Sequence, residues 1–228
     1  HGADALRFGL LAMSSTQDVR YSDAKVQQGR DLANKLWNAS RLILLNCKFE
    51  QDQSHINAPQ DQVPAAVERR TPHPDRVEDR WVLSRLERTI ASVTEKLDGY
   101  DFAHAATEAY GFFWSELCDW YLEIAKPRLY EGEEDASAVL LWALERVLAL
   151  LHPIMPFVTE EIWRHHPARQ GHLAIHPFPE ADESLLDAAA EAEVGAAIEL
   201  TRRLRAWRDM VEAPAASKLS ARIEGEAP

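Results

Sequence analysis

The chain has 228 residues, of which 46% are hydrophobic, 27% charged and 8% aromatic, a composition typical of globular proteins. Its 25 basic and 37 acidic residues give a net charge of −12, which argues against a uniformly basic nucleic-acid coat protein but allows a local basic surface. No run of about 18 apolar residues and no signal-peptide pattern is present, so we expect neither a membrane span nor secretion. Two cysteines are too few for a disulfide scaffold, and free buried thiols in a reducing cytoplasm are expected.

Helical periodicity dominates the sequence, and glycine is scarce, at 9 residues. After an apolar opening segment (3–13) and a polar turn, Ser22 or Asp23 is expected to cap a helix that runs to about Phe49. One apolar stripe recurs along this helix at steps of three and four residues: Leu32, Leu36, Ala39, Ile43 and Cys47.

Residues 50–77 are polar and rich in proline, which predicts a long and partly mobile loop. Asp79 is expected to open the next helix, and Gly99 to end it. Asp101 is then expected to cap a helix that stops at Pro127, because proline disrupts the helical hydrogen-bond ladder.

The remaining pattern predicts three further helices. One starts at Asp135 or Ser137, a short one covers 159–163 after a proline break, and the last runs roughly over 185–211. Residues 165–183 are expected to form a loop or a short extended segment. Short connections between long amphipathic helices favour antiparallel neighbours, so the predicted fold is all-α, an up-and-down helix bundle.

We expect three parts along the chain. Residues 1–21 form a lead-in segment, 22–183 form the helical bundle with its mobile loop 50–77, and 184–228 form a C-terminal helix and tail.

The helix that starts near residue 22 also carries a polar stripe, nearly opposite the apolar one: Arg30, Asn34, Trp37, Arg41 and Lys48. Cations contact phosphates, an indole offers a stacking surface and an amide reads a base edge, as single-stranded nucleic acid requires. A solvated helix face whose tryptophan packs against a neighbouring helix explains the same pattern.

The last helix contains four arginines around one tryptophan: Arg202, Arg203, Arg205, Arg208 and Trp207. They are expected either to contact phosphates or to pair with acidic neighbours on a surface helix.

No arrangement of side chains indicates catalysis. A histidine group near two prolines lacks the cysteine support of a typical zinc site: His165, His166, His172 and His176. Glu116, Asp119 and Glu123 are expected to face solvent or to bond to arginines of adjacent helices. The sequence contains no Ser/His/Asp, Cys/His or phosphate-loop arrangement, so the chain is not expected to be catalytic by itself.

Six segments carry a family resemblance. They are GADALRF (2–8), STQDVR (15–20), NKLWNASR (34–41), DRWVLSRL (79–86), FFWSELCDWYLEIAKPRL (112–129) and LHPIMPFVTEEIW (151–163). Together they resemble the class I aminoacyl-tRNA synthetases of the aliphatic group, most closely the valine–tRNA ligases, and they span essentially the whole chain.

The resemblance implies the helical anticodon-binding domain of such a ligase. The catalytic and editing domains and a C-terminal coiled-coil arm would lie outside this chain, which would then be a fragment. The parent reaction would be the ATP-dependent attachment of valine to its tRNA, with ATP and magnesium held by the absent catalytic domain and no cofactor in this part. The implied partner is tRNA of the valine isoacceptors, bound by a cytoplasmic monomer, with no role for DNA or a membrane.

Carried over position by position, the anticodon pocket of the family falls on Lys25, Arg41, Leu42 and Leu122. Relatives can have arginine in place of Lys25, and many have phenylalanine in place of Leu42. The resemblance therefore implies apolar contact at Leu42, or Trp37 as a substitute stacking surface. The polar stripe supplies further candidate tRNA contacts: Arg30, Asn34, Trp37 and Lys48.

Two alternatives stay open at this point. One is the equivalent domain of an isoleucine– or leucine–tRNA ligase. The other is a helical protein-interaction scaffold whose basic stripe pairs with acidic partners. Binding to the three tRNAs with exchanged anticodons distinguishes the first alternative from a valine–tRNA ligase domain. The salt dependence of binding distinguishes the second alternative from an RNA-binding domain.

Overall fold

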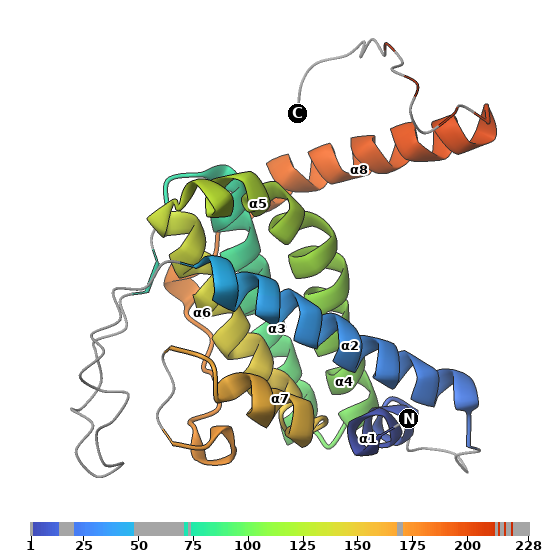
Figure 1. Ribbon diagram of the computed structural model, residues 1–228, viewed down its shortest axis with the longest axis vertical. Helices are drawn as coiled ribbons and strands as arrows, with labels where there is room; N and C mark the ends of the chain where they lie inside the picture. Colours follow the sequence, from blue (N-terminus) through green and yellow to red (C-terminus); the bar gives the residue numbers. More distant parts are fainter. Residues whose placement is uncertain are drawn as a thin grey trace.

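The computed structural model describes residues 2–13, 21–47, 71–72, 74–167, 171–212, 214, 217 and 220. Every regular element in these ranges is a helix (Figure 1), which confirms the all-α prediction. In chain order the helices are α1 (Ala3–Leu11), α2 (Asp23–Asn46), α3 (Val77–Asp98), α4 (Phe102–Gly111), the π-helix η2 (Phe112–Tyr121), α5 (Leu122–Glu131), α6 (Glu134–Leu151), α7 (Pro156–Trp163), the 3₁₀ helices η3 (Leu173–Ile175) and η4 (Glu183–Leu185), and α8 (Ala188–Met210).

Helix α6 occupies the middle of the bundle, where it contacts α2, α3, α4, α5 and α7. Its side chains are buried on almost every side, and Leu140, Leu144 and Leu148 are each 0% exposed. Neighbouring helices bury their apolar stripes against it, including Leu36 of α2 and Ile90 of α3. Burial of such stripes is what stabilises helices of this length in water.

Several helix ends lie where local sequence signals place them. The Ser22 side chain accepts a hydrogen bond from the Lys25 backbone N–H at 3.4 Å, which caps α2. Asp101 caps α4 in the same way through the His104 N–H at 3.3 Å, and Gly99 ends α3. These three predictions are confirmed.

Other ends differ from the prediction by a few residues. Helix α2 ends at Asn46 instead of continuing to Phe49, which lies outside the described residues, as does most of the predicted loop 50–77. Helix α7 starts at Pro156, three residues before the predicted start, because proline is favoured in the first turn of a helix.

The prediction that a helix stops at Pro127 is wrong. Helix α5 contains Pro127 and continues to Glu131, where Gly132 ends it with a left-handed backbone (φ 77°). Proline removes one backbone hydrogen bond, but the next turn is anchored by tertiary contacts. Arg128 and Leu129 are only 7% and 1% exposed, so leaving the helical path would expose both side chains.

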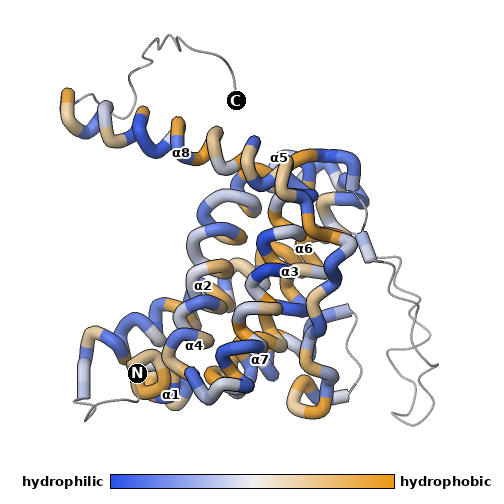
Figure 2. Tube along the Cα trace, turned by 180° about the vertical axis from the view of Figure 1, so that it is seen from behind, coloured by the Kyte–Doolittle hydropathy of each residue, from blue (hydrophilic) through white to orange (hydrophobic). Residues whose placement is uncertain are grey.

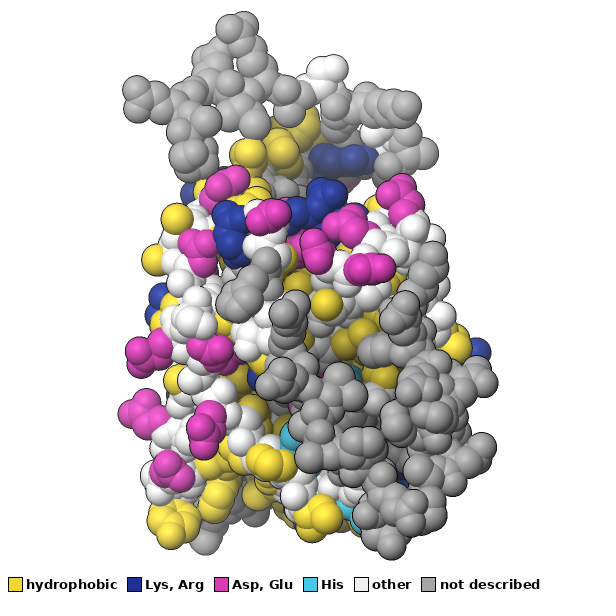
Figure 3. Space-filling model, turned by 90° about the vertical axis from the view of Figure 1, so that its left-hand side faces the viewer, with side chains coloured by type: hydrophobic (Ala, Val, Ile, Leu, Met, Phe, Trp, Pro, Cys, Tyr) yellow, Lys and Arg dark blue, Asp and Glu magenta, His cyan; other side chains and the backbone are white. Residues whose placement is uncertain are grey.

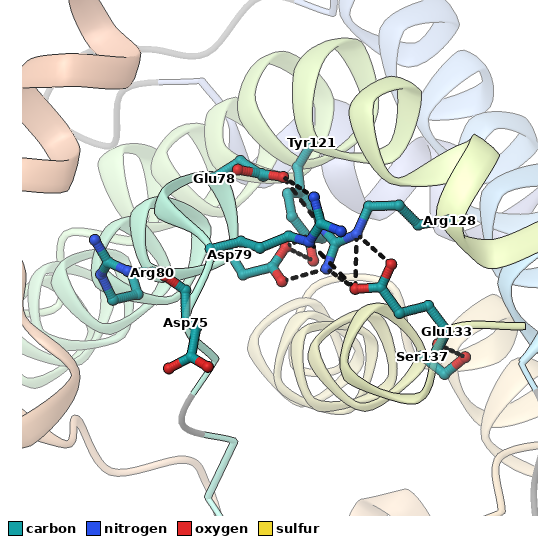
Figure 4. A network of polar contacts seen from close by, with 9 residues as sticks. Asp75, Glu78, Asp79, Arg80, Tyr121, Arg128, Glu133 and Ser137 are labelled. Carbon is teal, nitrogen blue, oxygen red and sulfur yellow. Dashed lines mark hydrogen bonds and ion pairs between the residues drawn. The ribbon is translucent and has the colours of Figure 1, made fainter.

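The anchoring contact is a buried polar network between α3, η2, α5 and the start of α6 (Figure 4). Arg128 donates two hydrogen bonds of 2.6 Å to the carboxylate of Asp79, and Tyr121 donates one of 2.8 Å to the same group. Arg128 also donates to Glu133 at 2.7 Å. Burial, followed by the Asp79 charge, raises the pKa of Tyr121 well above its ordinary value, so the phenol stays protonated as a donor.

Helix α1 is fixed to the opposite end of the bundle. The Asp4 carboxylate accepts hydrogen bonds from the backbone N–H groups of Phe157 (3.2 Å) and Val158 (2.7 Å), and thereby caps α7. Arg7 donates to the backbone carbonyl of Ile154 at 3.0 Å. The start of the described chain is therefore tied to a segment about 150 residues away in sequence.

Two glycines allow α1 and α2 to approach closely. A Cβ atom on Gly29 would lie 2.7 Å from the carbonyl oxygen of Ala5, and one on Gly9 would lie 2.8 Å from a methyl carbon of Val26. Both distances are shorter than van der Waals contact, so the packing of the two helices requires residues without a side chain at both positions.

Helix α8 lies across one end of the bundle, and its C-terminal half projects beyond it (Figures 1 and 2). Its N-terminal turn is held on α3 by ion pairs of Arg80 with Asp187 (2.9 Å) and of Arg88 with Glu191 (2.7 Å). The projecting half carries both hydrophilic and hydrophobic residues (Figure 2). This crossing departs from a simple up-and-down arrangement.

Both cysteines are buried free thiols, as predicted. Burial raises the pKa of Cys47 to about 11 and that of Cys118 to about 12. None of the described helices combines the length and apolarity needed to cross a bilayer.

Candidate nucleic-acid interface

A pocket of about 570 Å³ lies where α2, η2, α5 and α8 meet. Its size falls in the range of about 300–1,000 Å³ that is usual for sites binding small groups. The wall combines apolar, aromatic, basic and acidic side chains. They include Asn38 and Leu42 of α2, Cys118, Asp119 and Trp120 of η2, Leu122 and Glu123 of α5, and Arg202 and Arg205 of α8.

Two of the sequence-predicted site residues meet in this pocket. Leu42 is half-buried on α2, and Leu122 is 5% exposed at the start of α5. The fold thus brings them to one surface, although they belong to different helices. Together they offer an apolar contact surface of the kind that a planar base can cover.

The other two predicted pocket residues do not line the pocket. Arg41 is exposed on α2, next to Leu42 in sequence. Lys25 lies 16 positions before Arg41 on the same helix, which corresponds to about 24 Å along the helix axis. Its ammonium group lies 3.4 Å from the side-chain oxygen of Gln28. Lys25 and Arg41 therefore cannot contact the same nucleotide.

The polar stripe of α2 is solvent-accessible. Arg30, Asn34, Trp37 and Arg41 are all exposed, and the Trp37 side chain is 40% exposed instead of packed in the bundle. At 100° per residue, Arg41 lies about 60° around the helix from Asn38, which lines the pocket. The stripe and the pocket therefore adjoin. Lys48, the last predicted member of the stripe, lies outside the described residues.

Two arginines of the polar stripe and two arginines of the pocket differ from most other cations in the described parts of the chain, which have acidic partners. In the described parts of the chain, Arg30, Arg41, Arg202 and Arg205 form no ion pair. Near the top of the face drawn in Figure 3, by contrast, a group of Lys and Arg side chains lies directly beside Asp and Glu side chains. Positive charge without local compensation is therefore present on α2 and α8, despite the net charge of −12.

Trp120 connects the pocket to α8. The guanidinium carbons of Arg202 and Arg205 lie 5.8 and 5.2 Å from the centre of its ring, within cation–π range. From the sequence, two roles stayed open for these arginines: contact with phosphates, or pairing with acidic neighbours. A usable signal was the spacing of Arg202 and Arg205, which places them on one helix face, apart from Arg203.

The candidate carboxylates and histidines have structural partners. Glu116 accepts two hydrogen bonds from Arg85 of α3, at 2.7 and 2.9 Å, and Asp119 pairs with Lys35 at 2.7 Å. His172 lies 2.9 Å from Glu160. Across the described ranges, no His, Cys, Asp and Glu side chains are grouped so as to hold a metal ion.

Comparison with known proteins places this geometry in context. The family described as the anticodon-binding domain of tRNA ligase matches residues 79–223. The chain is 37% identical to the valine–tRNA ligase of Bacillus cereus over 99% of its length, and 36% identical to that of Bacillus subtilis over 98%. It spans about a quarter of the length of these relatives (25% and 24%).

A solved structure, the ternary complex of Agrobacterium radiobacter K84 agnB2 LeuRS with tRNA and LeuAMS, resembles 82% of this chain with a TM-score of 0.59. The similarity involves 20% of that chain at 20% sequence identity, and it supports the helical fold. The family match covers well over half of the sequence. The chain therefore belongs to the family of anticodon-binding domains of tRNA ligases.

Proposed function

We propose that this chain recognises the anticodon loop of valine tRNA, as the anticodon-binding part of a valine–tRNA ligase. The observation that carries the proposal is the pocket that contains Leu42 and Leu122 and is bordered by Arg202 and Arg205, which form no ion pair within the described residues. The similarity to valine–tRNA ligases supports the choice of tRNA.

The chemistry of the surface suits an unpaired RNA loop. Bases of such a loop are unstacked, so a pocket can enclose one base and contact both its faces and its edge. Leu42 and Leu122 would pack against the faces, and Asn38 would offer a hydrogen-bonding amide. Arg41 and Arg30 of the adjoining stripe would neutralise phosphates, and Trp37 would stack on a neighbouring base.

Lys25 would contact a different nucleotide from the one that Arg41 contacts. Its distance of about 24 Å from Arg41 along α2 exceeds the span of a single nucleotide contact, so we assign it to a separate part of the bound RNA. The bundle between the two ends would fix the distance from the anticodon to the rest of the ligase, so that binding at one end positions the tRNA at the other.

Catalysis would belong to the rest of the ligase. We propose that this chain by itself is a cytoplasmic monomer that binds tRNA without a cofactor, and that ATP and magnesium act only in the catalytic part of the parent enzyme. The expected result is no valine-dependent exchange of pyrophosphate with ATP by the isolated chain. Measurable exchange would refute this part of the proposal.

Binding to tRNA transcripts tests the main proposal. Fluorescence anisotropy with valine, isoleucine and leucine tRNAs should give the tightest binding for valine tRNA, and exchanging its anticodon should remove that preference. Tightest binding to another of the three would indicate the corresponding ligase. Binding that is independent of the anticodon would contradict the proposal altogether.

The contact of the polar stripe with RNA has its own test. Arg41→Gln should weaken binding and reduce the slope of log affinity against log salt by about 0.7, the value for one single-strand phosphate contact. Arg164→Gln is the matched control, because Arg164 is an exposed arginine of the α7 end of the bundle that pairs with Glu161 at 3.0 Å. Equal effects of the two substitutions would place the RNA elsewhere.

A further inference from the structure

One wall of the pocket comes from α8, where Arg202 and Arg205 lie on the same helix face. Both guanidinium groups lie near the Trp120 ring, at 5.8 and 5.2 Å. Arg203 points elsewhere: it pairs with Glu199 at 2.9 Å, and its side chain is 76% exposed. Adjacent arginines of one helix thus have two different environments.

The charges around the pocket are unevenly balanced. On the side of η2 and α5, Asp119 pairs with Lys35 at 2.7 Å, and Glu123 pairs with Lys126. On the side of α8, neither Arg202 nor Arg205 has an acidic partner within the described part of the protein. The uncompensated charge of the pocket is therefore positive, and it is located on α8.

Two like charges three residues apart on a helix repel each other. The Trp120 ring offsets part of this repulsion, because its electron-rich face attracts both guanidinium groups. Such a cation–π contact favours one position of a guanidinium while its N–H donors remain available for a ligand. An anion bound between the two groups would remove the remaining repulsion.

We propose that Arg202 and Arg205 bind backbone phosphate of the RNA nucleotide whose base enters the pocket, with Trp120 holding both guanidinium groups in place. The proposal rests on the proposed function and deepens it, because it makes α8 the phosphate-binding wall of the anticodon site. Base and phosphate would then be held by different helices, which fixes the direction in which the RNA strand crosses the pocket.

Salt dependence of binding tests the charge contribution. The ligand is a hairpin with the anticodon stem and loop of valine tRNA, and the protein is the full chain. The double variant Arg202→Gln/Arg205→Gln should bind more weakly, with a slope of log affinity against log salt reduced by about 1.4 for two phosphate contacts. Arg203→Gln is the matched control and should leave the slope unchanged. Circular dichroism of each variant verifies that α8 remains folded.

Neutral phosphate analogues then locate the contact. Hairpins that carry a single methylphosphonate at successive loop positions should show one position, or two adjacent ones, at which the unmodified protein loses affinity. For the double variant, the methylphosphonate at that position should cause no further loss of affinity, because the protein substitutions and the neutral phosphate remove the same contact. Trp120→Phe retains an aromatic face and should keep most of the salt slope.

The outcomes separate this proposal from the proposed function. Failure of the unmodified chain to prefer the valine anticodon would refute the proposed function. A normal preference together with an unchanged slope in the double variant would refute only the phosphate assignment. Weaker binding at an unchanged slope would also refute it, because the arginines would then act by packing against Trp120.

Discussion

Asp79 of α3 and Arg128 of α5 are 49 residues apart in sequence and face each other through two hydrogen bonds of 2.6 Å. Asp79 is 0% exposed and Arg128 is 7% exposed. Tyr121 and Glu133 complete the hydrogen bonding of the pair. The contact holds α5 in place beyond Pro127, and α5 begins with the pocket residue Leu122.

Asp79→Asn should destabilise the protein strongly, because it removes the fully buried carboxylate of the pair and leaves Arg128 with only the more exposed carboxylates of Glu133 and Glu78 as counter-charges. Removal of one partner of a buried ion pair typically costs about 3–5 kcal/mol. Urea unfolding followed by circular dichroism measures the change. Glu199→Gln removes one partner of the exposed pair with Arg203 and should cost less than about 1 kcal/mol. Similar losses of unfolding free energy for both variants would show that the buried network of Asp79 and Arg128 contributes little to stability.

Gly29→Ala should separate α1 from α2, because the new methyl group would lie 2.7 Å from the Ala5 carbonyl oxygen. Overpacking of this kind typically costs about 1–3 kcal/mol in the free energy of unfolding. Gly195→Ala is the control within α8, where a Cβ atom meets nothing within 4 Å. That substitution should stabilise the protein by up to about 1 kcal/mol through helix propensity. A stabilising effect at Gly29 would contradict the close packing.

Leu42→Phe should tighten tRNA binding, because it adds an aromatic face to the pocket wall on α2. Stacking of one base on an aromatic side chain is worth about 1–3 kcal/mol. Anisotropy titrations with valine tRNA measure the gain, and Leu10→Phe, an exposed position on α1, supplies the control. If both variants bind as the unmodified chain does, no base reaches Leu42.

Acidification should weaken the fold through His152 at the end of α6. Burial lowers the pKa of His152 below its ordinary value of 6.5, although the Glu160 and Asp4 carboxylates oppose the shift. The unfolded chain then binds a proton at a pH where the folded chain does not, so this contribution to stability falls as the pH drops below about 6.5. The slope of the unfolding free energy between pH 7 and pH 5, measured with urea, should be smaller in His152→Gln. An unchanged slope would show that His152 is not a source of the pH dependence of stability.

Local sequence chemistry accounts for the helices and for many of their ends. Ser22, Gly99 and Asp101 act on backbone groups within a few residues, so their effects can be predicted from local chemistry. Apolar periodicity likewise identified the buried face of α2, as Leu36 and Ile43 show.

The path of the chain beyond Pro127 and the composition of the pocket depend on contacts between helices. The helix persists through Pro127 because Arg128 is held by Asp79 of another helix, a contact that no local pattern reveals. Arg202 and Arg205 form one wall of the pocket, and their position depends on how α8 crosses the bundle. Hydrogen bonds within a helix span only about four residues, so local sequence fixes where helices form. Which helices meet depends on packing among all of them at once, and the candidate site lies at such a junction.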